Sequence, residues 1–216
     1  TAGPDLQPSG LVIWAVKPQT FREAALAAGP HLGGALHLSV AAGITSDSMA
    51  TWLGTQRIVR AMPNTPALVG LGMTGLFSRD GASAADRALV ETVVKTTGAL
   101  VWVATERDLD AVTALSGSGP AYVFYFLEAM RDAGANMGLA PEVALQLAVG
   151  TFVGASTLAQ RSTEPPQVLR ERVTSKGGTT YAALTSMEAA GMKASFEEAL
   201  KAAQRRAEEL GREFGA

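Results

Sequence analysis

The chain has no cysteine and few aromatic side chains. None of its 216 residues is Cys, and Phe, Trp and Tyr together make up 6%. Without thiols, disulfide bonds and thiolate catalysis are excluded. Histidine is nearly absent as well, and neither His31 nor His37 has the Cys or carboxylate spacing of a metal site. We therefore expect no metal, and structural or exposed roles for both histidines.

The chain also lacks a strong charge of one sign and a long apolar run. Its 18 Lys and Arg and 20 Asp and Glu give a net charge of −2 and a pI near 5.7, which argues against a nucleic-acid surface. No uninterrupted apolar run reaches the roughly 18 residues that span a bilayer, and no secretory signal opens the chain. We expect a soluble, cytoplasmic protein without nucleic-acid or membrane partners.

The first half of the sequence alternates apolar strands with helical patterns. Strands are expected at residues 11–16, 35–40, 57–62, 72–78 and 100–104, with a helix at 84–97. This alternation predicts βαβ units and a parallel sheet of the Rossmann-like, dinucleotide-binding type. Such a sheet has both faces covered and binds its nucleotide at the carboxyl ends of the strands.

The glycine-rich turn of such a sheet is missing. No Gly-x-Gly-x-x-Gly precedes the first strand at Leu11, although this turn normally holds the cofactor pyrophosphate. We expect that about the first two βα units and part of a third are absent, and that the printed chain binds dinucleotide poorly and is slow or inactive. The alternative, a complete protein with four or five strands, leaves an exposed apolar edge at residues 11–16.

Small or polar residues follow three of the expected strands. Lys17 and Pro18 end the first, Val40, Ala41 and Ala42 end the second, and a loop with two prolines around Asn64 follows the third. Lys17 is either a solvated lysine or a contact to the cofactor. The small residues after the second strand either let a flat ring approach the backbone or serve the packing of a helix against the strand. The proline-flanked loop is predicted to be rigid, with no room for helix, and to serve binding near the nicotinamide.

After Thr105 every segment is predicted to be helical. We assign residues 1–105 to the remainder of the nucleotide-binding domain and residues 106–216 to an all-helical domain. Helices are expected at 106–115, 120–134, 141–158 and 180–190, and a last one from Ser195, capped through Glu198. The helix at 141–158 is apolar on almost every face, so we expect a partner subunit to cover it.

The segment Ser175–Thr180, ahead of a helical pattern, is the most informative part of the chain. Gly177 and Gly178 let the backbone turn so that N–H groups converge beside the hydroxyls of Ser175, Thr179 and Thr180. The helix that follows adds the positive end of its dipole. The turn suits a small carboxylate; the alternative is an ordinary Gly-Gly loop with a Thr cap.

The run from Leu169 through Ser175 and Gly177–Thr180 to Glu188 resembles the signature of the 1-pyrroline-5-carboxylate reductases. Other landmarks of that family stand in the same order, at residues 15–19, 41–44, 60–66 and 115–122. Lys176 occupies a position where proline is common in the family. The resemblance covers nearly the whole chain and implies a truncated Rossmann-like domain followed by a helical dimerisation domain, in a homodimer or larger homo-oligomer.

The resemblance further implies an oxidoreductase that transfers hydride from NADPH or NADH to 1-pyrroline-5-carboxylate and gives L-proline. It implies substrate contacts at Ser175, Gly177, Gly178, Thr179 and Thr180, with Thr180 as the catalytic candidate that meets the ring nitrogen. The implied cofactor contacts are Ala15, Val16, Lys17, Pro18, Val40, Ala41, Ala42 and Asn64.

Three rival functions stay open from the residues: a reductase of hydroxy acids, a non-catalytic oligomerisation module, and a carboxylate-binding regulator. Hydroxy-acid reductases would be expected to show a catalytic lysine on a helix instead of the Ser-x-Gly-Gly-Thr-Thr turn. The sequence does not indicate whether the cofactor is NADPH or NADH. The residue that contacts the ribose 2′ position follows the second strand of such folds, and that strand is missing here.

Overall fold

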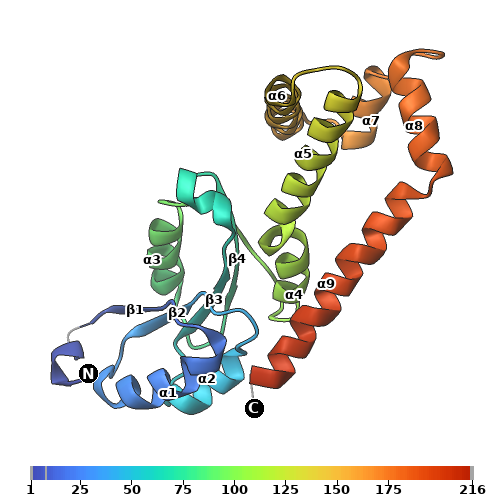
Figure 1. The fold of residues 1–216 in the computed structure, drawn as a ribbon. Helices are drawn as coiled ribbons and strands as arrows, with labels where there is room; N and C mark the ends of the chain where they lie inside the picture. Colours follow the sequence, from blue (N-terminus) through green and yellow to red (C-terminus); the bar gives the residue numbers. More distant parts are fainter. Residues whose placement is uncertain (1, 8, 215–216) are drawn as a thin grey trace. The chain divides into compact units, whose positions relative to one another are not determined.

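A computed structural model describes residues 2–7 and 9–214 of the chain (Figure 1). The backbone contacts divide it into two units, Thr1–Pro120 with Leu200–Ala216, and Ala121–Ala199. The expected functional boundary near residue 105 stays a prediction, since the compact units divide later in the chain.

The first unit is built on a five-stranded sheet whose spatial order follows the sequence. Its strands are β1 (Leu11–Trp14), β2 (Leu36–Ser39), β3 (Ile58–Met62), β4 (Gly72–Ser78) and β5 (Gly98–Trp102). All five expected strands are therefore confirmed, β4 with the expected bounds and the other four with small shifts at their ends. Strands β1, β2 and β3 are parallel neighbours, so their carboxyl ends lie side by side.

One pair of strands departs from the expected parallel sheet. Strand β4 runs antiparallel to β3, and β5 is parallel to β4. The residues between β3 and β4 are too few for a parallel crossover, which needs about a dozen or more. They form the 3₁₀ helix η3 (Thr65–Val69) instead. The expectation that the proline-flanked loop leaves no room for helix is therefore wrong.

Helices cover both faces of the sheet (Figure 1). One core cluster packs α1 (Pro18–Ala28) and α2 (Ser46–Leu53) against it, and a second packs α3 (Ala84–Val94) on the other face. Phe21, Met49 and Val90 are fully buried there, and a buried side chain of this size contributes about 1.5–3 kcal/mol. The first unit also contains η1 (Pro4–Leu6), η2 (Gly29–His31), α4 (Asp108–Val112) and a π-helical segment, Thr113–Gly117.

Helix α3 is fixed at its start by a capping box that also anchors an arginine. Ser83 and Asp86 exchange side-chain-to-backbone hydrogen bonds, and Asp86 accepts from Arg57 Nε at 3.0 Å and Nη2 at 2.5 Å. These bonds from Arg57 hold the pKa of Asp86 at about 2. The pair therefore ties α3 to the strand that follows α2.

The second unit is helical, as predicted. It contains α6 (Pro141–Arg161), α7 (Pro166–Arg172), α8 (Thr179–Ala189), nearly all of α5 (Gly119–Asn136) and the start of α9 (Met192–Phe214). The capping box expected at Ser195 is wrong. Gly191, with φ of 64°, turns the chain straight into α9, and the Ser195 hydroxyl donates to its carbonyl inside the helix at 3.1 Å.

Helix α6 exposes most of its apolar surface. Only Ala144 and Ala148 are buried, while Leu147, Val153 and Leu158 are 57–62% exposed. Its length and a mean hydropathy of 1.3 would also allow it to cross a membrane, a test that core helices of soluble proteins pass too. The expectation based on uninterrupted apolar runs missed this helix, so the absence of a membrane partner stays a prediction.

Candidate functional site

Three predicted cofactor segments follow three adjacent parallel strands. Ala15 and Val16 leave β1, and Lys17 is the N-cap residue of α1, with Pro18 in its first turn. Val40 and Ala41 leave β2, and Asn64 follows β3 and caps η3. Because β1, β2 and β3 are parallel neighbours, the structure brings these segments to one edge of the sheet.

The segment after β2 is held tightly. The Val40 N–H donates to the Trp14 carbonyl at 3.1 Å, and the Ala41 N–H donates to the Ser39 hydroxyl at 3.2 Å. Ala41 is 6% exposed. Its side chain is a single methyl group, which adds little bulk at the strand end. Gly43 has a φ of 76°, and a Cβ there would meet Leu210 of α9 at 3.1 Å. Glycine at position 43 therefore allows close packing against α9, which is the packing alternative for the small residues after β2.

The Asn64 side chain is hydrogen-bonded to two other parts of the chain. Its side-chain Nδ2 lies 3.2 Å from both the carbonyl and the hydroxyl oxygen of Ser116, and its Oδ1 accepts from the Met73 N–H at 2.9 Å. Sequence reasoning missed Ser116 as a partner, because nothing local in the sequence links two residues that lie so far apart in the chain.

A Gly-x-Gly-x-x-Gly pattern does occur at residues 70–75, but in the wrong place for a pyrophosphate turn. It enters β4, whereas the nucleotide-binding pattern joins a strand to a helix. A Cβ at Gly98 would lie 2.1 Å from the Gly72 carbonyl oxygen, and a Cβ at Gly75 would lie 2.6 Å from Val112. These glycines therefore serve close packing between β4, β5 and α4.

A polar cavity of about 450 Å³ lies beside the segment after β2. Glu106 organises it, accepting from the Ser46 N–H and hydroxyl at 2.5 Å each and from Arg60 at 2.7 Å. Asp110 also lines the cavity, and burial raises the pKa of its carboxyl. Sequence reasoning singled out none of these acidic residues, which lie far from Ser46 and Arg60 along the chain.

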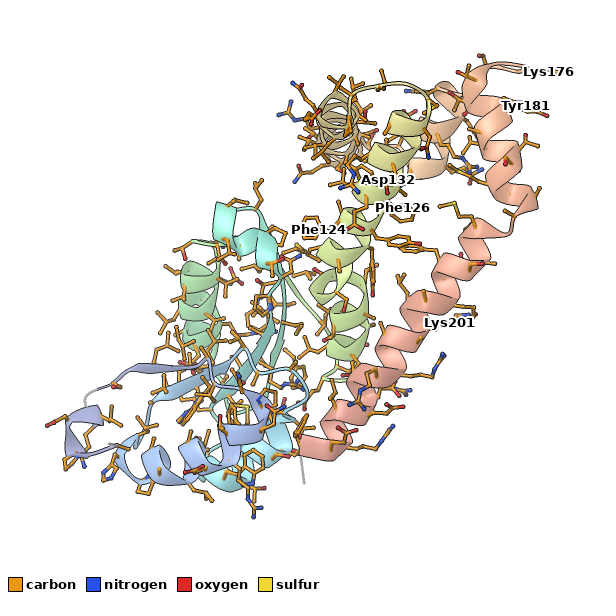
Figure 2. All side chains as sticks on the ribbon, in the orientation of Figure 1. Phe124, Phe126, Asp132, Lys176, Tyr181 and Lys201 are labelled. Carbon is orange, nitrogen blue, oxygen red and sulfur yellow. The ribbon has the colours of Figure 1, made fainter. Side chains whose placement is uncertain are left out.

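The Ser175–Gly178 segment of the second unit forms a type II β-turn. The Gly178 N–H donates to the Ser175 carbonyl at 3.0 Å, Gly177 has a φ of 75°, and no non-glycine residue among those described has a positive φ. Lys176 therefore holds the second turn position, where proline is favoured, and Gly177 the third, which requires glycine. Figure 2 shows Lys176 at the tip of this turn and Tyr181 on the helix after it.

Helix α8 starts directly after this turn. Gly178 is its N-cap, and the first backbone bond of the helix runs from the Ala182 N–H to the Gly178 carbonyl at 3.1 Å. The N–H groups of Thr179, Thr180 and Tyr181 therefore have no partner inside the helix. The Gly178 N–H, expected to face a carboxylate, is instead used within the turn. A Cβ at Gly178 would lie 2.7 Å from the Ser175 hydroxyl, so glycine allows that hydroxyl to stay close.

The second unit also holds an apolar cavity of about 320 Å³. Phe126 projects from α5 beside it (Figure 2), and its ring centre lies 5.8 Å from that of Phe196 in α9. Leu184, Met187 and Met192 complete the apolar lining. None of the predicted site residues lines this cavity.

Comparison with known proteins identifies close relatives. Residues 106–210 match a family model described as pyrroline-5-carboxylate reductase dimerisation. The chain is 44% identical to a pyrroline-5-carboxylate reductase of Pseudomonas aeruginosa over 207 residues, covering 95% of this chain and 76% of the relative. It is 40% identical to one of Arabidopsis thaliana over 203 residues, covering 94% and 73%.

Solved structures give the same result. A Plasmodium falciparum pyrroline carboxylate reductase with NADP bound superposes with a TM-score of 0.90 at 30% identity, covering 98% of this chain and 81% of that one. A pyrroline-5-carboxylate reductase from Coxiella burnetii gives 0.89 at 37% identity, covering 94% and 77%.

Proposed function

This chain belongs to the pyrroline-5-carboxylate reductase family, and from that premise we propose how its residues divide the work of reducing 1-pyrroline-5-carboxylate to L-proline. Bound NADPH or NADH supplies the hydride that adds to the C=N carbon of the substrate. The chain's own residues must hold the cofactor, orient the imine ring and neutralise the carboxylate. Relatives at this identity disfavour a hydroxy-acid reductase and a carboxylate-binding regulator.

The strand ends of β1, β2 and β3 are the proposed cofactor side. Lys17 is exposed there and would meet the phosphate and ribose, with Ala15, Val16 and Pro18 beside it. Val40, Ala41 and Ala42 would lie against the flat ring, since the two alanines add little bulk and leave the backbone accessible. The main observation that supports the proposal is that these segments lie at the same edge of the sheet.

The turn before α8 is the proposed carboxylate site. The unpartnered N–H groups of Thr179 and Thr180 at the positive end of the helix dipole, and the Ser175 hydroxyl, are donors suited to an anion. Gly177 and Gly178 supply the backbone shape that presents them. Lys176 keeps this geometry without the proline common in the family.

Thr180 is the proposed partner of the ring nitrogen. The nitrogen gains basicity as the hydride arrives, so a hydroxyl beside it stabilises the transition state more than the bound substrate. A threonine hydroxyl is a weak acid. Its role is therefore to orient the ring and to pass a proton from water.

The arrangement of the whole enzyme is also proposed. Residues 1–105 would hold the cofactor and residues 106–216 would form the substrate and dimerisation domain, a division that the match over residues 106–210 supports. The same match supports a homo-oligomer, which we take to be a dimer or a multiple of it. A cytoplasmic location fits an enzyme that depends on NADPH or NADH.

Two substitutions test the division of labour at the turn. Ser175→Ala removes a bond made in ground and transition states alike, so it should mainly raise KM for the substrate, by the equivalent of about 1–3 kcal/mol. Thr180→Ala should lower kcat, because its partner changes character only during hydride transfer. Steady-state kinetics at saturating NADPH, on a full-length enzyme with the complete nucleotide-binding domain, distinguish the two effects.

Neither substitution should weaken cofactor binding, since Lys17 and the strand ends lie in the other unit. Lys17→Ala provides the matched control and should raise KM for NADPH instead. If Thr180→Ala leaves kcat intact, the turn is a carboxylate clamp only and the ring nitrogen has another partner.

A further inference from the structure

Asn64, Ser116 and Met73 are joined in a closed ring of hydrogen bonds. The Met73 N–H donates to Asn64 Oδ1 at 2.9 Å, Asn64 Nδ2 donates to the Ser116 hydroxyl at 3.2 Å, and that hydroxyl donates to the Met73 carbonyl at 3.4 Å. Asn64 Nδ2 also donates to the Ser116 carbonyl at 3.2 Å. Each group in the ring both donates and accepts, so the bonds reinforce one another.

The ring fixes which way the Asn64 amide faces. A backbone N–H only donates, so the atom facing Met73 must be the amide oxygen, and the nitrogen must face the two oxygens of Ser116. Both amide N–H groups and one lone pair of the oxygen are then used within the protein. Little hydrogen-bonding capacity is left for a ligand.

The three residues come from three different segments of the chain. Asn64 follows β3, Met73 is the second residue of β4, and Ser116 lies in the π-helical segment Thr113–Gly117. The π segment is closed by a bond from the Ser118 N–H to the Thr113 carbonyl at 2.8 Å. Its extra residue per turn places Ser116 toward the sheet, and π segments of this kind are frequent at functional sites.

Packing at the same junction is tight. A Cβ on Gly117 would lie 2.6 Å from the Met62 side chain at the end of β3. The π segment therefore contacts the strand end directly, and the ring of bonds locks that contact. The Met62 atom concerned is the terminal methyl of its side chain, so the π segment is connected to the backbone after β3 mainly through the bonds between Ser116 and Asn64.

We propose that Asn64 and Ser116 are a positioning pair that sets the orientation of the nicotinamide ring through the backbone at the end of β3. The inference rests on the proposed function, in which the ends of β1, β2 and β3 hold the cofactor. Asn64 acts here through Ser116 and not as a direct cofactor ligand. A cofactor whose nicotinamide is misplaced still binds, because most cofactor contacts are elsewhere, but it transfers hydride slowly.

The test compares Asn64→Ala, Ser116→Ala and the double variant in a full-length enzyme that carries the complete nucleotide-binding domain. Each single variant should lower kcat by about ten- to a hundredfold while the Kd for NADPH, measured by calorimetry, stays nearly unchanged. The double variant should be no slower than the slower single variant, since either change opens the same ring. Ser116→Thr keeps the hydroxyl and should restore kcat. Ser118→Ala, a neighbour outside the ring, is the matched control.

Two results would overturn the inference. If Asn64→Ala weakens NADPH binding as much as it lowers activity and Ser116→Ala does neither, Asn64 is a direct ligand. If both single variants keep the parent's kcat, the ring has no catalytic consequence. Ser116→Ala removes only a hydroxyl, and its melting temperature shows whether the fold is intact. A full-length enzyme with the complete nucleotide-binding domain that neither binds NADPH nor reduces 1-pyrroline-5-carboxylate would instead contradict the proposed function.

Discussion

At the scale of single residues, His37 shows how a polar group is accommodated in the core. It is 2% exposed in the middle of β2, and its Nδ1 accepts a hydrogen bond from the Trp14 indole at 3.0 Å. Burial, and next the positive charge of Arg57, lower its pKa to about 4. The imidazole is therefore neutral in the folded protein at any pH near 7, as an acceptor for Trp14 must be.

This lowered pKa makes stability depend on pH. Between pH 6.5 and 4 the unfolded chain binds a proton at His37 that the folded chain does not, so the free energy of unfolding falls as the pH falls. From pH 7 to pH 5 the loss should be about 2 kcal/mol. Urea unfolding at the two pH values measures it.

His37→Gln should remove this loss, and His31→Gln should keep it. The comparison between variants is needed because the pKa of Asp110 is raised by burial, which acts in the opposite direction in every variant. The ion pair of Asp86 does not interfere, because its pKa of about 2 keeps it charged above pH 5. An unchanged pH dependence in His37→Gln would mean that another group titrates.

At the scale of elements, the turn before α8 offers a test of Lys176. The residue occupies the second position of a type II turn, where the fixed φ of proline fits without strain. Lys176→Pro should raise the free energy of unfolding by about 0.4–1 kcal/mol, because it restricts the unfolded chain. Gly177→Ala, at a φ of 75°, should instead destabilise by about 1–2 kcal/mol.

Chemical denaturation of both variants measures these changes. A lower stability for Lys176→Pro would show that the turn of this chain differs from a type II turn. Since Ser175 and the α8 N-terminus are unchanged in that variant, KM for 1-pyrroline-5-carboxylate should stay the same or fall slightly.

The sequence predicted elements well where the signal is local. Apolar runs located β1–β5, and the helix expected from residue 141 begins there, with Pro141 as the first residue of α6. The antiparallel β3–β4 pair was missed because apolar runs carry no direction, and only the short η3 connection decides it. Helix α7 was missed because seven residues give too little periodicity.

The same distinction holds for the candidate site. Lys17, Ala41 and Asn64 were predicted from their places after strands, and the structure brings their segments to one edge. The bond from Asn64 to Ser116 and the bonds from Ser46 and Arg60 to Glu106 could not be predicted. Such pairs depend on how distant segments pack, which no short stretch of sequence records.

At the scale of the whole molecule, contacts within a single chain do not explain the exposed apolar surface of α6. Leu147 and Val153 are 57% and 62% exposed, on a helix whose only buried residues are Ala144 and Ala148. Exposed apolar surface on this scale marks an interaction site. The helix lies within the residues that match the dimerisation model. We therefore expect the second subunit to cover it.

Leu147→Asp and Val153→Asp together should convert the oligomer into monomers, since each places a charge where a partner's apolar surface would lie. Both side chains are exposed within one chain, so the fold of the monomer should survive and circular dichroism should be unchanged. Gln146→Asp, an exposed polar residue of the same helix, is the matched control and should leave the oligomer intact. Sedimentation velocity distinguishes the species. If the double variant sediments as the parent does, the partner subunit covers another surface, and the apolar face of α6 needs a different explanation.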